Sequence, residues 1–152
     1  MGKQMGQSTA VAYETDFYAW TQHQTNLLRD EEFEELDLPN LIEELAAMAR
    51  RERRELISRL IGLLGHLLKW QVQGDLRSRS WQNTIRTQRL EIALLLADSP
   101  SLRALLEEFV ASAYPQARDV ASKETDLLRP RFPESCPYTV EQILADDFSP
   151  ET

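Results

Sequence analysis

The chain has 152 residues, a formal net charge of −8 and one cysteine, Cys136. Its 42 % hydrophobic and 28 % charged residues are typical of one ordinary globular domain, and a single thiol excludes an intrachain disulfide or a multi-thiolate metal site. The longest mostly apolar run, residues 60–68, falls far short of the ~20 residues that cross a bilayer. We therefore expect a cytoplasmic protein that has no contact with membranes.

Charge is unevenly distributed along the chain. Residues 50–90 contain ten of the 17 Lys and Arg residues and only three acids, whereas residues 14–44 contain ten acids and one base. These two segments can neutralise each other within one fold, so the pattern disfavours a nucleic-acid footprint without excluding one.

The first expected elements are a flexible N-terminal tail, residues 1–12, and a helix that begins at Thr15 or Asp16 and ends near Arg29. Either side chain can cap free amide groups at the start of that helix. One face of the helix carries the residues that we expect to face the core: Tyr13, Phe17, Trp20, Gln24 and Leu27.

A long helix is predicted at about 39–72. Pro39 suits a first helical turn, and no proline or glycine intervenes from Asn40 to Ile61. Apolar residues recur along this helix at helical spacing: Leu38, Leu41, Ile42, Leu45, Ala49, Leu56, Leu60, Leu63 and Leu67. A rod of this length needs several neighbouring segments to cover its apolar face.

Two further helices follow. Residues 80–97 fit a third helix, whose buried side is expected to carry Trp81, Ile85, Gln88, Ile92 and either Leu95 or Leu96. Ser99 and Pro100 supply a cap and a first-turn proline for a fourth helix. The apolar stripe of that helix comprises Leu102, Leu105, Leu106, Phe109, Ala113, Ala117, Val120 and Leu127. Pro115 lies inside it and predicts either two helical segments or one bent helix.

The C-terminal part ends in a short helix after a proline-rich stretch. Regular helix is excluded over residues 129–138 by three prolines, Pro130, Pro133 and Pro137. Thr139 and Gln142 then form the sequence pattern of a capping box and predict a terminal helix at 139–145. Residues 13–152 are therefore expected to form a single all-α domain, a helical bundle of four to six helices built around the long central helix.

Short motifs spread along the chain resemble those of one bacterial family. They are Asp16-Phe17-Tyr18-Ala19-Trp20, Leu41-Ile42-Glu43-Glu44-Leu45, His66-Leu67-Leu68-Lys69-Trp70, Arg77-Ser78-Arg79-Ser80-Trp81, Phe132-Pro133 and Cys136-Pro137-Tyr138. The family is catalogued as domain of unknown function twenty-nine, and the resemblance covers nearly the whole chain in order. It implies an all-helical bacterial domain. It implies no activity and no catalytic residues, because none is assigned to the family.

One edge of the long helix carries polar residues that its core pattern does not explain. Six consecutive charged residues occupy positions 50–55, and Glu52 is the one that meets the apolar stripe. Arg59 and His66 follow Glu52 at spacings of seven and fourteen residues, so the three side chains lie within about 40° of one another around the helix. They are the candidate catalytic residues of a polar cleft, with His66 as acid or base and Arg59 stabilising an anion.

The separation of Arg59 and His66 also fits, loosely, the Arg-x(6)-His pattern of helical ribonucleases from prokaryotic toxin systems. Such a spacing arises readily by chance on a long helix, and Leu60 stands where those enzymes favour a polar residue. We favour the alternative in which Glu52 pairs with a buried or half-buried arginine across the bundle and His66 is a hydrogen-bonded residue at the edge of the core.

A second candidate site lies at the start of the third helix. Bases accompany an aromatic side chain there, as they do in sites for nucleic acids or other anions: Arg77, Arg79, Trp81, Arg86 and Arg89. The favoured alternative is a helix cap whose arginines reach the acidic N-terminal helices, while Trp81 fills the core beside Trp70.

No bound metal and no cofactor are expected. Helical di-iron proteins need Glu-x-x-His pairs, and neither His23 nor His66 has a glutamate three residues before it. Glu124 lies on the apolar stripe of the fourth helix and could meet Glu52 or His66 in a mixed carboxylate and imidazole site. Two histidines and one cysteine in the whole chain make that site a minor alternative.

Two functional hypotheses follow. The favoured one is a small cytoplasmic helical domain for protein–protein interaction, an adaptor without catalysis whose partner is another protein or a second copy of itself. The alternative is a nucleic-acid-binding or ribonuclease-like helical module that uses Glu52, Arg59 and His66 with the basic segment 77–89. Burial discriminates between them, because a catalytic site needs these side chains in a water-filled pocket.

Overall fold

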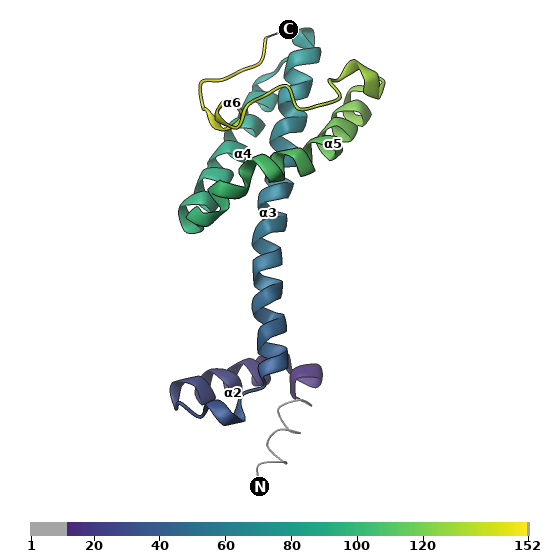
Figure 1. Cartoon of the computed structure of the whole chain (residues 1–152). Coiled ribbons are helices and arrows are strands. Elements are labelled where there is room, and N and C mark those ends of the chain that lie inside the picture. The colour runs from purple at the N-terminus through teal and green to yellow at the C-terminus, as the bar shows by residue number, and fades with distance from the viewer. Residues whose placement is uncertain (1–11, 152) are drawn as a thin grey trace. The chain divides into compact units, whose positions relative to one another are not determined.

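The computed structural model describes residues 12–151. All regular elements in this range are helices and no strand occurs there, which confirms the predicted all-α class. The chain divides into two compact units between Arg50 and Arg51. We call the described parts the N-terminal unit, residues 12–50, and the C-terminal unit, residues 51–151 (Figure 1). No helix within residues 12–151 is both long and apolar enough to cross a bilayer.

The predicted N-terminal tail, residues 1–12, lies outside the described residues except for Ala12, which starts a helical turn at residues 12–15. α2 follows at Phe17–Arg29, within two residues of the predicted bounds. The carboxylate of Asp16 accepts a hydrogen bond from the backbone amide of Ala19 at 3.0 Å and caps the first turn, as its position in the sequence indicates.

Only part of the predicted apolar face of α2 is buried. Trp20, Gln24 and Leu27 are buried as expected, whereas Phe17 is half exposed. The rings of Tyr13 and Phe17 instead pack against Trp20, with centroid separations of 4.8 and 5.7 Å. These three aromatic side chains therefore pack against one another.

Hydrogen bonds around Asp37 join α2 to the start of the next helix. The indole Nε1 of Trp20 donates to Asp37 Oδ2 at 2.9 Å, and the Asn40 side chain donates to the same oxygen at 2.7 Å. The backbone amide of Asp37 donates to Gln24 Oε1 at 2.9 Å. These hydrogen bonds join α2 to the start of the next helix and satisfy the polar groups of Asp37.

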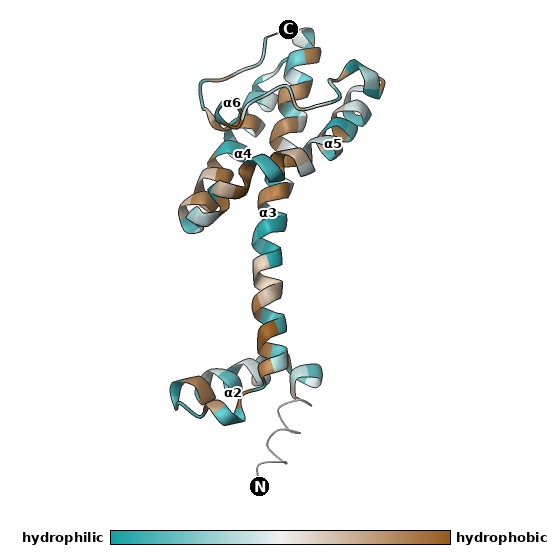
Figure 2. Ribbon diagram, in the orientation of Figure 1, coloured by the Kyte–Doolittle hydropathy of each residue, from teal (hydrophilic) through white to brown (hydrophobic). Residues whose placement is uncertain are grey.

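Large apolar side chains of the N-terminal unit are mostly exposed. The short 3-10 helix η1, at Phe33–Glu35, exposes its phenylalanine, and Figure 2 shows apolar residues along the first turns of the helix that follows. The exposed large apolar residues of this unit are Phe17, Tyr18, Leu28, Phe33, Leu38, Ile42, Leu45 and Met48. The expectation that neighbouring segments cover the whole apolar face of the long helix is wrong here, because the described part of this unit offers only α2, η1 and the turn at 12–15.

α3 extends over Leu38–Val72, which confirms the long helix predicted at about 39–72. Its residues from 51 onward belong to the C-terminal unit, and burial there begins at Leu56, directly after the charged residues 50–55. From that point the apolar stripe is fully buried: Leu56, Leu60, Leu63, Leu64, Leu67 and Leu68.

α4 (Arg79–Asp98) and α5 (Leu106–Thr125) pack around this part of α3 in the C-terminal unit (Figure 1). A 3-10 helix, η2 (Gly74–Leu76), leads into α4, where the Ser78 hydroxyl caps the first turn. Gly62 permits close approach, since a Cβ there would lie 3.3 Å from the Gln88 side chain. The hydrophobic core formed with the α3 leucines includes Ile85, Ile92 and Leu96 of α4 and Phe109, Val110, Ala113, Tyr114, Ala117 and Ala121 of α5.

The fourth predicted helix starts differently from the expectation. Pro100 stands in the first turn of a 3-10 helix, η3, at Pro100–Leu105, and the Ser99 side chain makes no capping hydrogen bond. α5 then begins at Leu106 and continues past Pro115 as one helix, so the alternative of two separate segments is wrong. Pro115 is exposed, and the helix tolerates it there at the loss of one backbone N–H donor.

The C-terminal segment follows the prediction closely. Within 129–138 the only helical turn is a short 3-10 helix, η4, at Arg129–Arg131. α6 (Val140–Leu144) follows and has the predicted capping box, in which the amide of Gln142 donates to Thr139 Oγ1 at 3.1 Å. Three residues of this segment are buried against the core: Phe132, Tyr138 and Ile143.

Candidate functional site

The three polar-edge residues of α3 lie in three different environments. Glu52 is exposed, so it is not the buried charge that the sequence indicated, and burial begins only at Leu56. Arg59 donates from Nε to Glu55 Oε1 at 2.9 Å, in an ion pair within the same helix. Consecutive members of the row are about 10.5 Å apart along the axis, too far for one to contact the next.

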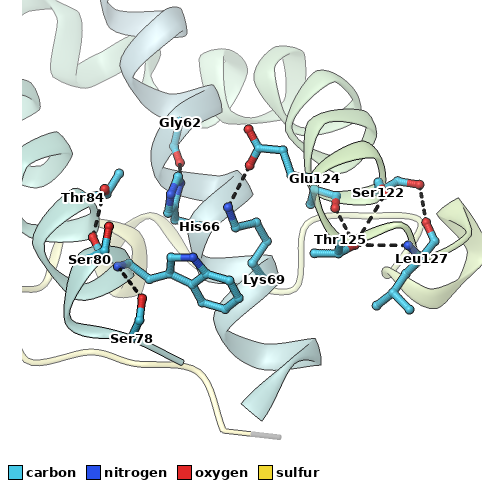
Figure 3. A network of polar contacts seen from close by, with 12 residues as sticks. Gly62, His66, Lys69, Ser78, Ser80, Thr84, Ser122, Glu124, Thr125 and Leu127 are labelled. Carbon is cyan, nitrogen blue, oxygen red and sulfur yellow. Dashed lines mark hydrogen bonds and ion pairs between the residues drawn. The ribbon is translucent and has the colours of Figure 1, made fainter. Parts of the chain in front are cut away.

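His66 is half-buried and hydrogen-bonded to its own helix (Figure 3). Its Nδ1 lies 3.0 Å from the carbonyl oxygen of Gly62, which can only accept, so Nδ1 carries the proton and Nε2 is the acceptor of the neutral ring. Burial, and secondly the positive charge of Lys69, lower the pKa of His66. The imidazole is therefore neutral at neutral pH, as expected of a residue at the edge of the core.

An ion pair lies one turn further along α3. Lys69 is 7 % exposed, and its Nζ donates to Glu124 Oε2 of α5 at 2.7 Å (Figure 3). The same ammonium lies 4.9 Å from the centroid of the Trp81 ring on α4, a favourable distance for a cation–π contact. One buried cation therefore connects three helices of the C-terminal unit.

Sequence reasoning missed this pair and gave Glu124 other partners. The minor alternative considered above has Glu124 meet Glu52 or His66, whereas the structure joins Glu124 to Lys69. The sequence does contain a signal for this pair. Lys69 follows a run of leucines, and Glu124 falls on the apolar stripe of its own helix. Two charges of opposite sign at such positions are candidates to pair. Among residues 12–151, no three His, Cys, Asp or Glu side chains are grouped closely enough to hold a metal ion.

The arginines of the second candidate site have different surroundings. Arg79 and Arg86 are exposed on α4, and Trp81 is half-buried. Arg77 donates from Nε to the carbonyl oxygen of Trp70 at 2.7 Å, with its guanidinium 5.1 Å from the ring centroid of that tryptophan. A polar hollow of about 510 Å³ adjoins this turn and is lined by Arg79, Ser80, Asn83, Thr84, Thr87 and Gln88.

Arg89 is buried and holds the C-terminal segment. Its guanidinium donates to three backbone carbonyls, those of Ile143 at 2.9 Å, Phe148 at 3.0 Å and Gln142 at 3.3 Å. Burial lowers the pKa of Arg89, and two nearby aspartates oppose that effect. The position of Arg89 on the buried stripe could be predicted from the sequence, since Arg89 follows Ile85 by four residues and precedes Ile92 by three.

A row of exposed apolar side chains occupies the first turns of α3. Leu38, Ile42 and Leu45 follow one another at spacings of four and three residues, so they share one face of the helix, and Met48 flanks it. They are 55, 64, 66 and 54 % exposed, respectively. We call these four residues the N-terminal face. Single exposed leucines are common on protein surfaces, whereas a continuous exposed row of apolar side chains is less common on a monomeric protein.

A family model described as "Domain of unknown function DUF29" matches residues 12–149. The chain belongs to this family. The match spans the described parts of both units and confirms the resemblance carried by the short motifs. Comparisons with curated proteins and with solved structures find no match. Because the DUF29 description names no activity, membership of this family assigns no function to the chain.

A hollow of about 510 Å³ lies beside α5 of this DUF29 domain, bordered by Tyr114, Cys136 and Tyr138. Both phenol hydroxyls are engaged, with Tyr138 donating to Gln71 Oε1 at 2.6 Å and Tyr114 donating to a backbone carbonyl of the proline-rich segment. Burial raises the pKa of Tyr114 to about 12 and also raises the pKa of the Cys136 thiol. The thiol is therefore protonated at neutral pH, which is the unreactive state of cysteine.

Proposed function

We propose that the chain is a protein–protein interaction domain that acts as an adaptor through its N-terminal face. One observation carries the proposal: the described N-terminal unit exposes eight large apolar side chains and buries only two, Trp20 and Leu27. Moving one such side chain from water to an apolar contact gains ~1.5–3 kcal/mol. A partner that covers the whole row therefore gains several such increments.

The size of the N-terminal unit supports the same proposal. Its described part, residues 12–50, is near the lower limit at which a chain buries enough surface to be stable alone. The C-terminal unit differs, because its leucines from Leu56 to Leu68 are covered by α4 and α5. A partner on the N-terminal face would supply the cover that the described chain lacks.

Affinity capture with matched variants tests the proposal. The full chain is immobilised as wild type, as Ile42→Ser with Leu45→Ser, and as the control Leu90→Ser with Leu94→Ser, whose side chains are exposed on α4. We expect a protein from a lysate of the native cells to be retained by the wild type and by the α4 control, and to be lost with the N-terminal pair. Retention that is equal for all three chains would refute the proposal.

Nucleic-acid binding is a second candidate, favoured by one observation. Arg79 and Arg86 are exposed seven residues apart on α4, and Arg79 borders the polar hollow of about 510 Å³. Fluorescence anisotropy with labelled RNA tests it, by comparing Arg79→Gln with Arg86→Gln against the exposed control pair Arg103→Gln with Arg131→Gln. Weakened binding in the first pair alone would support this function, and equal binding by both pairs would contradict it. If the chain cleaves the RNA and His66→Ala abolishes that cleavage, the polar edge of α3 is catalytic.

A further inference from the structure

We infer that the partner of the N-terminal face is a basic amphipathic helix of another protein. This inference rests on the proposed function and adds the chemistry of the partner to it. It follows from the net charge of the unit that carries the face and from the spacing of the apolar residues within that face.

The charge of the N-terminal unit is strongly one-sided. Residues 1–50 contain ten acids and three bases, a formal net charge of −7, whereas residues 51–152 contain 15 acids and 14 bases. The acids that are exposed in the described unit are Glu14, Asp16, Asp30, Glu31, Glu32, Glu34 and Glu43. Of its described bases, Arg29 is exposed and Arg50 is bound to Glu43 at 2.9 Å.

Such a surface selects its partner by charge as well as by shape. Complementary potentials speed association and suppress partners of the wrong sign, so an acidic surface favours Lys and Arg on the other side. Nucleic acids, anionic lipid surfaces and a second copy of this acidic unit all carry the wrong sign. Among protein partners, a basic one fits.

The apolar row determines the shape of that partner. Leu38, Ile42 and Leu45 are spaced as in the seam of two packed helices, and Met48 adds a side chain that adapts to different surfaces. Ala46 and Ala49 lie between and beside them and let another backbone come close. The row spans about 15 Å at 1.5 Å per residue, which matches roughly three turns of a partner helix.

Binding to three synthetic helices tests the inference with the full chain. The first is a peptide of Leu and Lys whose leucines form one stripe; in the second Glu replaces Lys; the third keeps the composition of the first but scatters its leucines around the helix. We expect the first peptide to bind with a dissociation constant at least about tenfold below those of the other two. We also expect its binding to weaken at high salt.

Variants locate the binding site. Ile42→Ser with Leu45→Ser should weaken binding of the basic amphipathic peptide about tenfold, while Leu90→Ser with Leu94→Ser leaves it unchanged. Replacing Glu31, Glu32 and Glu34 by Gln should weaken binding and flatten its salt dependence. The same change at Glu107, Glu108 and Glu141, exposed in the C-terminal unit, should do neither.

Several outcomes would overturn the inference. Equal binding of the basic and acidic stripes, or a dimer in sedimentation analysis that Leu45→Glu dissociates, would leave the proposed docking role intact and refute the basic partner. Stronger peptide binding after deletion of residues 1–11 would identify that segment as the occupant and also refute it. If the capture experiment and the peptides both fail to depend on Ile42 and Leu45, the proposed function fails as well.

Discussion

The two units of the chain put the same apolar pattern to different uses. In the C-terminal unit, α4 and α5 cover the stripe of α3 from Leu56 to Leu68, and the few charges that enter the core are neutralised or hydrogen-bonded there. In the N-terminal unit, the row from Leu38 to Met48 is exposed, and seven acidic side chains of the same unit are exposed as well. Helical periodicity therefore identifies a face that becomes buried, but it does not say whether the cover comes from the same chain.

The contrast between the units predicts that truncating core leucines has unequal costs. Leu60→Ala removes a fully buried side chain and should lower the free energy of unfolding by about 2–5 kcal/mol. Leu45 has a side chain of the same size but is exposed, so Leu45→Ala should change the free energy of unfolding by less than about 0.5 kcal/mol. Urea unfolding followed by circular dichroism measures both, and similar losses for the two variants would contradict the contrast.

Arg89 offers a second test inside the C-terminal unit. Arg89→Met leaves three backbone carbonyls without their donor and should cost about 3 kcal/mol, with loss of order in the segment after Phe132. Arg86→Met, three residues away and exposed, should be nearly neutral. Thermal melts compare the two variants, and limited proteolysis shows whether the C-terminal segment detaches. An intact segment in Arg89→Met would mean that its apolar residues suffice to hold it.

The Lys69–Glu124 pair should respond unequally to loss of either partner. Glu124→Gln leaves a buried ammonium with a weaker acceptor and should cost about 1–2 kcal/mol. Lys69→Met leaves a carboxylate that is half exposed and can be hydrated, so its cost should be smaller. A double-mutant cycle by urea unfolding measures the coupling between the two sites, and a coupling of zero would show that the pair adds nothing to stability.

The smallest expected effect is a pH dependence from His66. Folding lowers its pKa below the ordinary value of 6.5, so the unfolded chain binds the proton more readily and the free energy of unfolding should fall as the pH decreases through 6.5. His66→Gln should remove that part of the slope, and the difference in slope should vanish well above this pH. Urea unfolding at a series of pH values measures it. A wild-type slope of opposite sign would contradict the neutral, half-buried ring.

Local sequence signals predicted most of the helix bounds. Asp16 and the Thr139–Gln142 capping box mark helix starts, and the absence of proline and glycine from residue 40 to 61 accounts for the length of α3. The start of α5 was predicted less well, because Pro100 fits a 3-10 turn as readily as the first turn of an α-helix.

The candidate site was harder to predict, because its pairs join different helices. Lys69 and Glu124 are 55 residues apart, and nothing local says that α3 and α5 bring them together. The role of Glu52 was misjudged for a related reason, since its position on the stripe is clear but the point at which burial begins depends on which helices are neighbours. The exposure of the N-terminal face could not be predicted for the same reason, because a sequence pattern identifies an apolar face but not the segment that packs on it.

Hydrogen exchange of the full chain, read by mass spectrometry, tests the central claim most directly. We predict that backbone amides in residues 38–50 of α3 exchange at least about tenfold faster than those in residues 56–68, because no segment of the described N-terminal unit covers their apolar face. Adding the basic amphipathic peptide should slow exchange in residues 38–50 and leave residues 56–68 unchanged. Equal protection of residues 38–50 and 56–68 without any peptide would contradict the claim that the N-terminal face is uncovered in the chain alone.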